Sequence, residues 1–560
     1  MVNPNLTDYQ EAYQSFNWVQ AEADMGLGDK LNIAQAAVDT NCGRGLRDKV
    51  ALLFWDGNRE QALTFGELKV LSDRFALALI RRGVRTGDHV ALFGRSSPEF
   101  YVSLLGTIKA GAVAVPLFEG YMAEALNEIL HDSGAAVLVT TAALKKRVNS
   151  SQLPRLQRLF VIGPTDAKTG AGEENWHKVI AEAAGTLETV TLDKDAPFAL
   201  LYTSGSTGKP KGIILSHGGL VQYYQTGRWV MDFHPEDVNW CTADLGWVTG
   251  IAYGIFSPWL NGVTTAVYGG SFSPERWYNF IQRFGVTVWY TTPSALRQLM
   301  GAGDAVTKRF NLKTLRHILS VGEALNPAII HWARGVFGLD VFDTWFMTET
   351  GAQIVANFRC LPIKPGSMGR PVPGIQVAVV DSQGKELGPM QMGQLAIRPP
   401  WPAMMRGIWK DETKYAEYFS NSWYLSGDLV YRDREGYYWY QGRADDIIKV
   451  GERRVGPFEV ENRLIEHPAV LEAGVIGKPD LLRGEVIKAF LVLRPGYRWS
   501  PKLKAELQDF VKNSLAEHMV PQEFEVCSAL PHTATGKLLR RVLKAREVGL
   551  PEGWDGETKT

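Results

Sequence analysis

The sequence predicts an α/β protein with two doubly wound units, followed by a β subdomain and a small α+β unit. Short apolar runs alternate with stretches of helical periodicity between residues 51 and 140, and the same alternation returns between 286 and 321. This alternation is typical of parallel sheets covered by helices on both faces. The 560 residues are 45% hydrophobic and 21% charged, which provides for a sizeable core.

The first unit is predicted from strand, helix and turn patterns. An apolar run at 51–55 predicts a strand, and the capping-box pattern Thr-Phe-Gly-Glu at 64–67 predicts a helix that continues to residue 82. Proline at 98, directly after a serine, predicts another helix start. The remaining apolar and amphipathic segments predict strands at 89–93, 112–117 and 136–140 and a helix at 122–131.

The second unit and the two smaller parts follow in order. Strands are expected at 286–291 and 317–321, with a helix at 293–300 between them. Short β segments with turns predict a β subdomain within 375–398. The last hundred residues predict a compact α+β unit with helices at 458–466 and 501–518 and strands at 471–476 and 487–493.

Composition excludes several classes of protein. Lys+Arg number 60 and Asp+Glu also number 60, so nothing indicates a nucleic-acid surface or an acidic tail. The four cysteines are far apart and form no Cys-x-x-Cys pair, which argues against a zinc site or a disulfide framework. No signal-peptide pattern or run of ~18 apolar residues is present. We therefore expect a cytoplasmic enzyme without membrane or nucleic-acid partners.

Residues 203–212 form the most informative segment of the chain, Thr-Ser-Gly-Ser-Thr-Gly-Lys-Pro-Lys-Gly. Glycines let backbone N–H groups approach an anion, and the hydroxyls and lysines supply further donors. The segment therefore predicts a phosphate-binding loop, with a solvated polar turn as the alternative. A Walker loop is excluded because two residues separate Gly205 from Gly208 and Pro210 follows Lys209; a Rossmann Gly-x-Gly-x-x-Gly is also missing.

This loop resembles the signature loop of the adenylate-forming superfamily, which contains acyl-CoA synthetases, firefly luciferases and peptide-synthetase adenylation domains. Further motifs of that family follow in its order, at 322–327, 343–351, 426–428, 442–446 and 535–537. Residues 247–250 and 258–262 are most similar to the acetyl-CoA synthetase branch. The resemblance covers nearly the whole chain.

The resemblance implies a large N-terminal ATP- and acyl-binding domain, 1–444, and a small mobile C-terminal domain, 445–560, with a hinge at Asp445. It implies an AMP-forming acid:CoA ligase that activates acetate or another short acid as an acyl-adenylate, with ATP, Mg²⁺ and CoA. Three alternatives remain open: an adenylating enzyme with another acyl acceptor, a ligase for a somewhat larger acid, and a catalytically silent nucleotide-binding or interaction protein.

The resemblance also implies roles for individual residues. Lys537 bridges the carboxylate and the α-phosphate as the adenylation catalyst, Thr348 binds phosphate, and Glu349 holds Mg²⁺, which prefers oxygen ligands. Asp428 accepts from the ribose hydroxyls, and Arg443 adds a donor. The implied ATP-binding set is Thr203, Ser204, Gly205, Ser206, Thr207, Gly208, Lys209, Gly322, Glu323, Ala324, Asp343, Thr344, Trp345, Thr348, Asp428, Arg443 and Arg454.

The acyl pocket is expected to be short. Phe346 stands where acetate enzymes of this branch have a pocket-closing tryptophan and many longer-chain relatives have glycine, while Val248, Thr249 and Val321 line the sides. One methylene changes binding in such a pocket by only ~1–3 kcal/mol, so the sequence leaves the choice among short acids open.

The sequence departs from the family pattern in the C-terminal domain. Glu452 stands where the glycine of the pantetheine tunnel is expected, and Gly451 lies one residue early. This puts the transfer to CoA in question. His532 and Thr535 replace the lysine and serine that usually precede the family's catalytic lysine. Acetylation of Lys537, which regulates some relatives, would remove the charge that adenylation needs.

Overall fold

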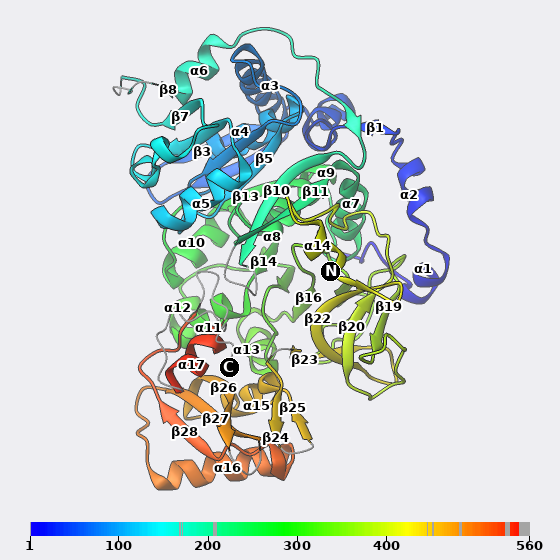
Figure 1. Cartoon of the computed structure of the whole chain (residues 1–560), viewed down its shortest axis with the longest axis vertical. Coiled ribbons are helices and arrows are strands. Elements are labelled where there is room, and N and C mark those ends of the chain that lie inside the picture. The colour runs from blue at the N-terminus through cyan, green and yellow to red at the C-terminus, as the bar shows by residue number, and fades with distance from the viewer. Residues whose placement is uncertain are drawn as a thin grey trace.

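The computed structural model describes residues 2–166, 170, 172–204, 210–444, 446–450, 453–480, 484–532 and 538–547. The molecule is elongated, and the C-terminal unit forms its lower end in Figure 1. Helices and strands alternate through the first part of the chain, as the sequence predicts.

The first sheet carries the hairpin that flanks the predicted phosphate loop. Its strands are parallel except for β11, which runs antiparallel to β10. Helices α3 (Phe65–Arg81), α4 (Pro98–Lys109), α5 (Ala123–Ser133) and α6 (Trp176–Glu182) connect or cover its strands. The order is β11 (Pro210–Ser216), β10 (Pro197–Ser204), β5 (Val113–Leu117), β4 (His89–Phe93), β6 (Val137–Thr141), β7 (Arg158–Ile162) and β8 (Glu173–Asn175).

The second sheet has a parallel centre with antiparallel margins. Its helices include α7 (Leu220–Trp229), α8 (Val248–Ile251), α9 (Ser257–Leu260), α10 (Pro274–Phe284), α11 (Pro293–Gly301), α12 (Asp304–Thr307) and α13 (Pro327–Phe337). The order is β18 (Arg370–Pro371), β17 (Val355–Ala356), β16 (Val341–Trp345), β15 (His317–Ser320), β14 (Val288–Thr291), β12 (Val238–Cys241), β13 (Thr264–Tyr268), β2 (Val50–Trp55) and β3 (Glu60–Thr64).

One expected strand lies in the other sheet. The apolar run 51–55 does form a strand, β2, but it pairs in parallel with β13 and antiparallel with β3, the next strand in sequence, rather than with the strands of the first sheet. The assignment of this strand to the first unit was therefore wrong. An apolar run of five residues predicts a buried strand but carries no information about a partner more than two hundred residues away.

The β subdomain is larger than the sequence predicts. Strands β19 (Val377–Val380) and β20 (Gly393–Ile397) fall within the expected range, and β21 (Phe419–Ser420), β22 (Trp423–Arg432) and β23 (Tyr438–Arg443) extend the same antiparallel sheet. A short helix, α14 (Glu412–Ala416), precedes β21. Strands β22 and β23 carry Asp428 and Arg443, so this sheet brings part of the predicted nucleotide site into place.

The C-terminal unit is an α+β structure, as predicted. It contains β24 (Ile448–Val450), β25 (Arg453–Val455), β26 (Val470–Asp480), β27 (Gly484–Leu493) and β28 (Glu523–Val526), with helices α15 (Pro457–Ile465), α16 (Pro501–Ser514) and α17 (Arg540–Glu547). A separate cluster of buried apolar side chains holds the sheet against α15 and α16. The predicted helices at 458–466 and 501–518 correspond to these two helices.

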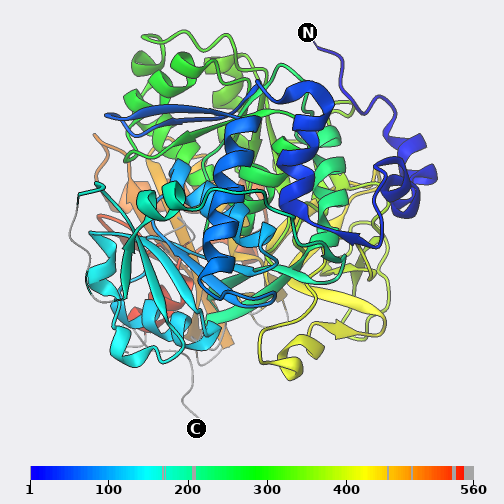
Figure 2. The ribbon, with the colours of Figure 1, turned by 90° about the horizontal axis from the view of Figure 1, so that it is seen from above.

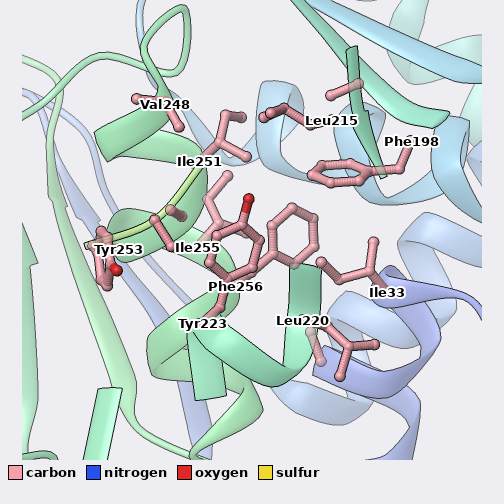
Figure 3. Packing of buried hydrophobic residues seen from close by; sticks show 14 of the residues in the cluster. Ile33, Phe198, Leu215, Leu220, Tyr223, Val248, Ile251, Tyr253, Ile255 and Phe256 are labelled. Carbon is pink, nitrogen blue, oxygen red and sulfur yellow. The ribbon is translucent and has the colours of Figure 1, made fainter. Parts of the chain in front are cut away.

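The main core lies where the β10–β11 hairpin meets the helices after β12 (Figure 3). Phe198 on β10 lies 5.3 Å from Phe256, edge to face, and Phe256 stacks near Tyr223 of α7. Burial of such aromatic side chains contributes strongly to stability because each removes a large apolar area from water. The core therefore fixes the hairpin that flanks the predicted phosphate loop relative to the second sheet.

The N-terminal segment lies along the outside of the large domain (Figure 2). It contains α1 (Tyr9–Ser15), α2 (Trp18–Asp24) and β1 (Lys30–Leu31), which pairs with β9 (Leu192–Asp193). The Tyr9 hydroxyl donates to the carbonyl of Pro371 at 2.8 Å, and the Trp18 indole donates to Gly374 O at 2.8 Å. Among the described residues, no helix is long and apolar enough to cross a membrane.

Candidate active site

The candidate site lies at the carboxyl edge of the second sheet. Val321 follows β15 and Phe346 follows β16, and these neighbouring strands run parallel. The Val321 N–H donates to the carbonyl of Thr291, the last residue of β14, at 3.1 Å. The edge at which parallel strands end is the usual place for ligand sites in open α/β sheets.

The predicted phosphate loop connects the strands of the β10–β11 hairpin. Thr203 pairs with Lys211 and Ser204 pairs with Pro210 in the antiparallel ladder. The predicted ATP-binding residues Gly205, Ser206, Thr207, Gly208 and Lys209 lie outside the described residues, as does the side chain of Ser204. The Thr203 hydroxyl is buried and finds no hydrogen-bond partner within the described part of the chain. Such an orphaned polar group at the end of a strand is compatible with a ligand contact.

A chain of polar groups joins this hairpin to the predicted metal ligand. Lys211 Nζ donates to the Tyr418 hydroxyl at 2.9 Å, and that hydroxyl donates to Glu349 Oε1 at 3.1 Å. Burial, followed by the nearby carboxylate, raises the pKa of Tyr418 and keeps the phenol protonated. Burial also lowers the pKa of Lys211, while Glu349 opposes that effect. The fold therefore brings a cation of the phosphate segment to within two hydrogen bonds of Glu349.

Glu349 fits a magnesium ion that is shared with a phosphate. Its side chain is buried, its backbone carbonyl accepts from Met405 N at 3.0 Å, and the half-buried Thr348 precedes it, three residues beyond the end of β16. Across the described ranges, no group of three or more His, Cys, Asp or Glu side chains could hold a metal alone. Mg²⁺ is commonly bound by one or two carboxylates together with substrate phosphates and water, which agrees with a single carboxylate here.

The predicted ribose ligands lie together on the β subdomain. Asp428 on β22 pairs with Arg443 on β23, and Arg443 Nη1 donates to Asp428 Oδ1 at 3.2 Å. The Trp345 indole donates to the other carboxylate oxygen at 2.8 Å. Trp345 therefore orients Asp428 from the end of β16, which is a positioning role that the sequence does not reveal.

The expected adenine-lining segment contains a glutamate held by a helix. Glu323 Oε2 accepts from Arg297 Nη2 and from Ser294 Oγ, each at 2.8 Å, and both donors lie on α11. Glu323 Oε1 is buried and, among the residues described, has no partner. Gly322 adopts φ +87°, which favours glycine, while Ala324 is half-buried. Neither Arg297 nor Ser294 stands out in the sequence, because α11 carries no recognisable motif.

Asp343 and Thr344 differ in whether a side-chain oxygen is left to bind a ligand. The Thr344 hydroxyl donates to Ser320 O at 2.8 Å and contacts the Tyr290 hydroxyl at 2.6 Å, so it is used inside the protein. Asp343 is buried in the middle of the same strand, β16, and its Oδ1 has no partner in the described structure. Burial raises the pKa of Asp343 to about 8.

The raised pKa makes the ligand-free protein sensitive to pH. The folded state binds a proton on Asp343 that the unfolded chain releases above its ordinary pKa of about 4, so stability falls as pH rises toward 8. We expect Asp343→Asn, which stays neutral, to lose this dependence, worth about 1.4 kcal/mol per pH unit in that window. Thermal unfolding of wild type, Asp343→Asn and the exposed control Asp166→Asn between pH 5 and 9 tests this. Parallel pH profiles for all three proteins would contradict it.

The predicted acyl-pocket residues are buried around the same edge. Val248 begins α8, Val321 follows β15, and both belong to the main core, as does Phe346. Thr249 is half-buried. The Phe346 ring packs edge to face against Tyr253, with ring centroids 5.4 Å apart. The structure thus brings the expected aromatic closing residue together with a tyrosine that no sequence motif marks.

Several predicted site residues fall in the C-terminal part of the chain. Lys537, Asp445, Gly451 and Glu452 lie outside the described residues, and Arg454 is described only as backbone in β25. Their predicted roles therefore stay predictions.

An ion-pair cluster joins the segment after Asp445 to the segment after Lys537. Arg540 Nη2 contacts Glu461 Oε2 at 2.6 Å, and Arg540 Nη1 and Lys544 Nζ contact Asp446 at 3.5 and 3.2 Å. Asp446 directly follows the predicted hinge residue, and Arg540 follows Lys537 by three positions. The cluster thereby links Asp446, which follows the predicted hinge residue, to helix α17, which begins three residues after Lys537.

Helices α13 and α15, and strand β23 and α15, also touch next to the predicted nucleotide segment. Asn326 caps α13 by accepting from Ala328 N at 2.7 Å, and its Nδ2 donates to Asn462 Oδ1 on α15 at 3.0 Å. Phe458 of α15 packs edge to face on Tyr440 of β23 at 5.5 Å. Both contacts involve segments that the sequence assigns to the neighbourhood of ATP.

The fold brings the predicted phosphate segment, the predicted metal ligand Glu349 and the predicted ribose ligand Asp428 to one sheet edge, the arrangement of a nucleotide-dependent enzyme. The chain belongs to the AMP-binding enzymes: that family model matches residues 39–409, and the model of the AMP-binding enzyme C-terminal domain matches residues 459–537. The resemblance to the adenylate-forming superfamily is thereby confirmed.

Curated relatives and solved structures agree with this assignment. The acetyl-coenzyme A synthetase of Bacillus subtilis is 50% identical over 553 residues, which cover 98% of this chain and 96% of that protein. The acetyl-coenzyme A synthetase of Methanothrix thermoacetophila is 36% identical, with 96% and 86% covered. Among structures, Brucella canis acyl-CoA synthetase (TM-score 0.77, 33% identity, 97% and 99% covered) and the anthranilate CoA ligase AuaEII with anthranoyl-AMP (0.86, 29%, 93% and 98%) are similar.

Proposed function

We propose that this chain is an AMP-forming acid:CoA ligase that activates acetate or another short-chain carboxylate with ATP and then transfers the acyl group to CoA. The observation that carries the proposal is a set of three contacts at and just after the end of β16. Trp345 contacts Asp428, the predicted ribose ligand, and Phe346 packs on the wall of the predicted acyl pocket. Glu349 is linked through Tyr418 to the predicted phosphate segment. The 50% identity to an acetyl-coenzyme A synthetase supports the same substrate class.

The first half-reaction joins two anions. A carboxylate oxygen attacks the α-phosphorus of ATP, the bond to the bridging oxygen breaks, and pyrophosphate leaves with its electron pair. Lys211 and Lys209 offset negative charge on the β- and γ-phosphates, and Lys537 bridges the carboxylate and the α-phosphate, because fixed cations lower the barrier where charge converges. Mg²⁺ at Glu349 would neutralise further phosphate charge.

The second half-reaction requires no covalent enzyme nucleophile. The CoA thiol, after losing its proton, attacks the carbonyl carbon of the acyl-adenylate, and AMP leaves with the former carboxylate oxygen. We propose that Asp445 is the hinge that exchanges the lysine segment for the Gly451–Glu452 segment between the two steps, as domain rotation can give one chain two configurations. A cytoplasmic location and regulation by acetylation of Lys537 belong to the same proposal.

A panel of acids tests the proposal directly. Pyrophosphate exchange into ATP is measured for each acid without CoA, and AMP formation is then measured with and without CoA. Exchange with acetate or another short acid, together with CoA-dependent AMP release, is the expected result. Exchange without CoA-dependent turnover would favour the alternative of an adenylating enzyme with another acyl acceptor. Glu452 blocking the pantetheine tunnel would explain that result. Absence of both activities would favour a silent nucleotide-binding protein.

Phe346 provides a test of the acyl pocket. Phe346→Gly removes the ring that closes the pocket, so we expect propionate and butyrate to gain at least tenfold in kcat/KM relative to acetate, since each methylene is worth ~1–3 kcal/mol in such a pocket. The measurement is exchange kinetics across unbranched acids. An unchanged chain-length profile would contradict the placement of Phe346 at the pocket end.

A further inference from the structure

Tyr253 lies directly behind the predicted pocket-closing residue. It belongs to the π-helical segment Ala252–Phe256 between α8 and α9 and is fully buried. Figure 3 shows its side chain on the other side of this segment from Phe256. The Phe346 ring meets the Tyr253 ring at 74° with centroids 5.4 Å apart, which is a favourable edge-to-face arrangement.

The Tyr253 hydroxyl is held by two hydrogen bonds. It accepts from the backbone N–H of Gln353 at 2.9 Å and lies 3.0 Å from Thr226 Oγ1. The Thr226 hydroxyl already donates to Gln222 O at 2.7 Å, so Tyr253 is the donor in their shared hydrogen bond. Both the donor and the acceptor capacity of the phenol are therefore used.

Neighbouring groups confine the ring as well. Tyr290 packs against Tyr253 at 87° with centroids 5.6 Å apart, and the Tyr290 hydroxyl accepts from Gln353 Nε2 at 3.2 Å. The Tyr253 carbonyl accepts from Asn239 Nδ2 at 2.9 Å. A buried side chain that is hydrogen-bonded at its tip and packed on its faces does not yield to a ligand without breaking these contacts.

We propose that Tyr253 is a specificity-determining residue: it is the rigid wall behind Phe346 and sets the maximum length of acid that the pocket admits once Phe346 is shortened. This inference rests on the proposed function, since it takes Phe346 as the end of the acyl pocket. Phe346 closes the pocket, and Tyr253 prevents its ring from retreating. A small side chain at 346 therefore opens only the space of one ring, bounded by Tyr253.

The wall predicts a stepwise change in chain length. Phe346→Gly is expected to accept propionate and butyrate but to leave hexanoate at least tenfold below butyrate in kcat/KM. Phe346→Gly/Tyr253→Leu removes the second ring and is expected to raise kcat/KM for hexanoate at least tenfold over the single variant. Tyr253→Phe keeps the ring but loses both hydrogen bonds, so the ratio of acetate to propionate kcat/KM is expected to fall several-fold through the KM values, with kcat for acetate retained.

Exchange kinetics on acids from acetate to octanoate, with circular dichroism and thermal unfolding of each variant, form the test. Tyr223→Phe is the matched control: it removes the hydroxyl of another buried tyrosine whose ring stacks on Phe256 and meets the Tyr253 ring edge to face at 6.5 Å, but which, among the described residues, has no ring contact with Phe346. We expect its length profile to equal that of wild type. If the double variant does not fold, Tyr253→Phe decides.

The proposal is overturned if Phe346→Gly takes hexanoate as well as the double variant does, or if Tyr253→Phe has the wild-type acetate-to-propionate ratio. These results are distinct from a failure of the proposed function, which would appear in the wild-type protein as no exchange with any acid of the panel.

Discussion

Lys537→Ala is expected to abolish formation of the acyl-adenylate, with a loss of about a hundred- to a thousandfold or more in acid-dependent pyrophosphate exchange. The lysine charge bridges the carboxylate and the α-phosphate only in this step, where two anions must approach each other. Thioester formation from supplied acyl-adenylate and CoA is expected to keep most of its rate. The two half-reactions are measured separately on the purified variant.

The control for this prediction is Arg541→Ala. Arg541 is an exposed cation on α17, four residues after the predicted catalyst, so its replacement removes the same charge from the same tail. We expect both half-reactions of that variant to stay near wild type. Equal loss of both half-reactions in Lys537→Ala would argue against a lysine that serves one configuration only.

Glu349→Gln is expected to lower pyrophosphate exchange by about a hundredfold and to raise the Mg²⁺ concentration needed for half-maximal rate. The amide retains an acceptor for the Tyr418 hydroxyl but loses the charge that attracts the ion. Titration of exchange rate with Mg²⁺ separates this effect from general damage, because excess Mg²⁺ should recover part of the rate.

Tyr418→Phe serves as the comparison for Glu349→Gln. It breaks the hydrogen-bonded link from Lys211 to Glu349 yet leaves the carboxylate charge in place. Its Mg²⁺ requirement is expected to lie much closer to that of wild type. A Glu349→Gln variant with the wild-type Mg²⁺ dependence would remove Glu349 from the role of metal ligand.

Much of the fold could be predicted from local pattern. The capping box at Thr64 and Glu67 is present in the structure, with both reciprocal hydrogen bonds, and α3 begins where it predicts. The helix at Pro293 and the strand at His317 also occur where expected. These features are determined by residues a few positions apart, which is the range over which periodicity and capping act.

Long-range features could not be predicted in the same way. Strand β2 joins the second sheet by pairing with β13. This partner lies more than two hundred residues away, and no local pattern specifies such a pairing. The sequence pattern predicts no strands at the positions of β22 and β23, although the motifs at Asp428 and Arg443 fall within them. Polar motif residues interrupt the hydrophobic alternation that would mark a strand.

The candidate site shows the same difference between local motifs and long-range contacts. Motifs identified Glu349, Asp428 and Phe346, but Tyr418, Arg297 and Tyr253 act through contacts that only the fold creates. Tyr418 links Lys211 to Glu349, and Arg297 holds Glu323 from a helix without a motif. Residues that support a functional group from another element carry no spacing signal, because their sequence distance from that group is unconstrained.

The fate of the carboxylate oxygen tests the central claim of adenylate formation most directly. Acetate labelled with ¹⁸O in both carboxyl oxygens is turned over with ATP and CoA, and the AMP is examined by mass spectrometry. One labelled oxygen in AMP is the predicted result, because the attacking carboxylate oxygen stays on the α-phosphorus when CoA displaces AMP. Unlabelled AMP, or label in pyrophosphate or inorganic phosphate, would contradict an acyl-adenylate intermediate.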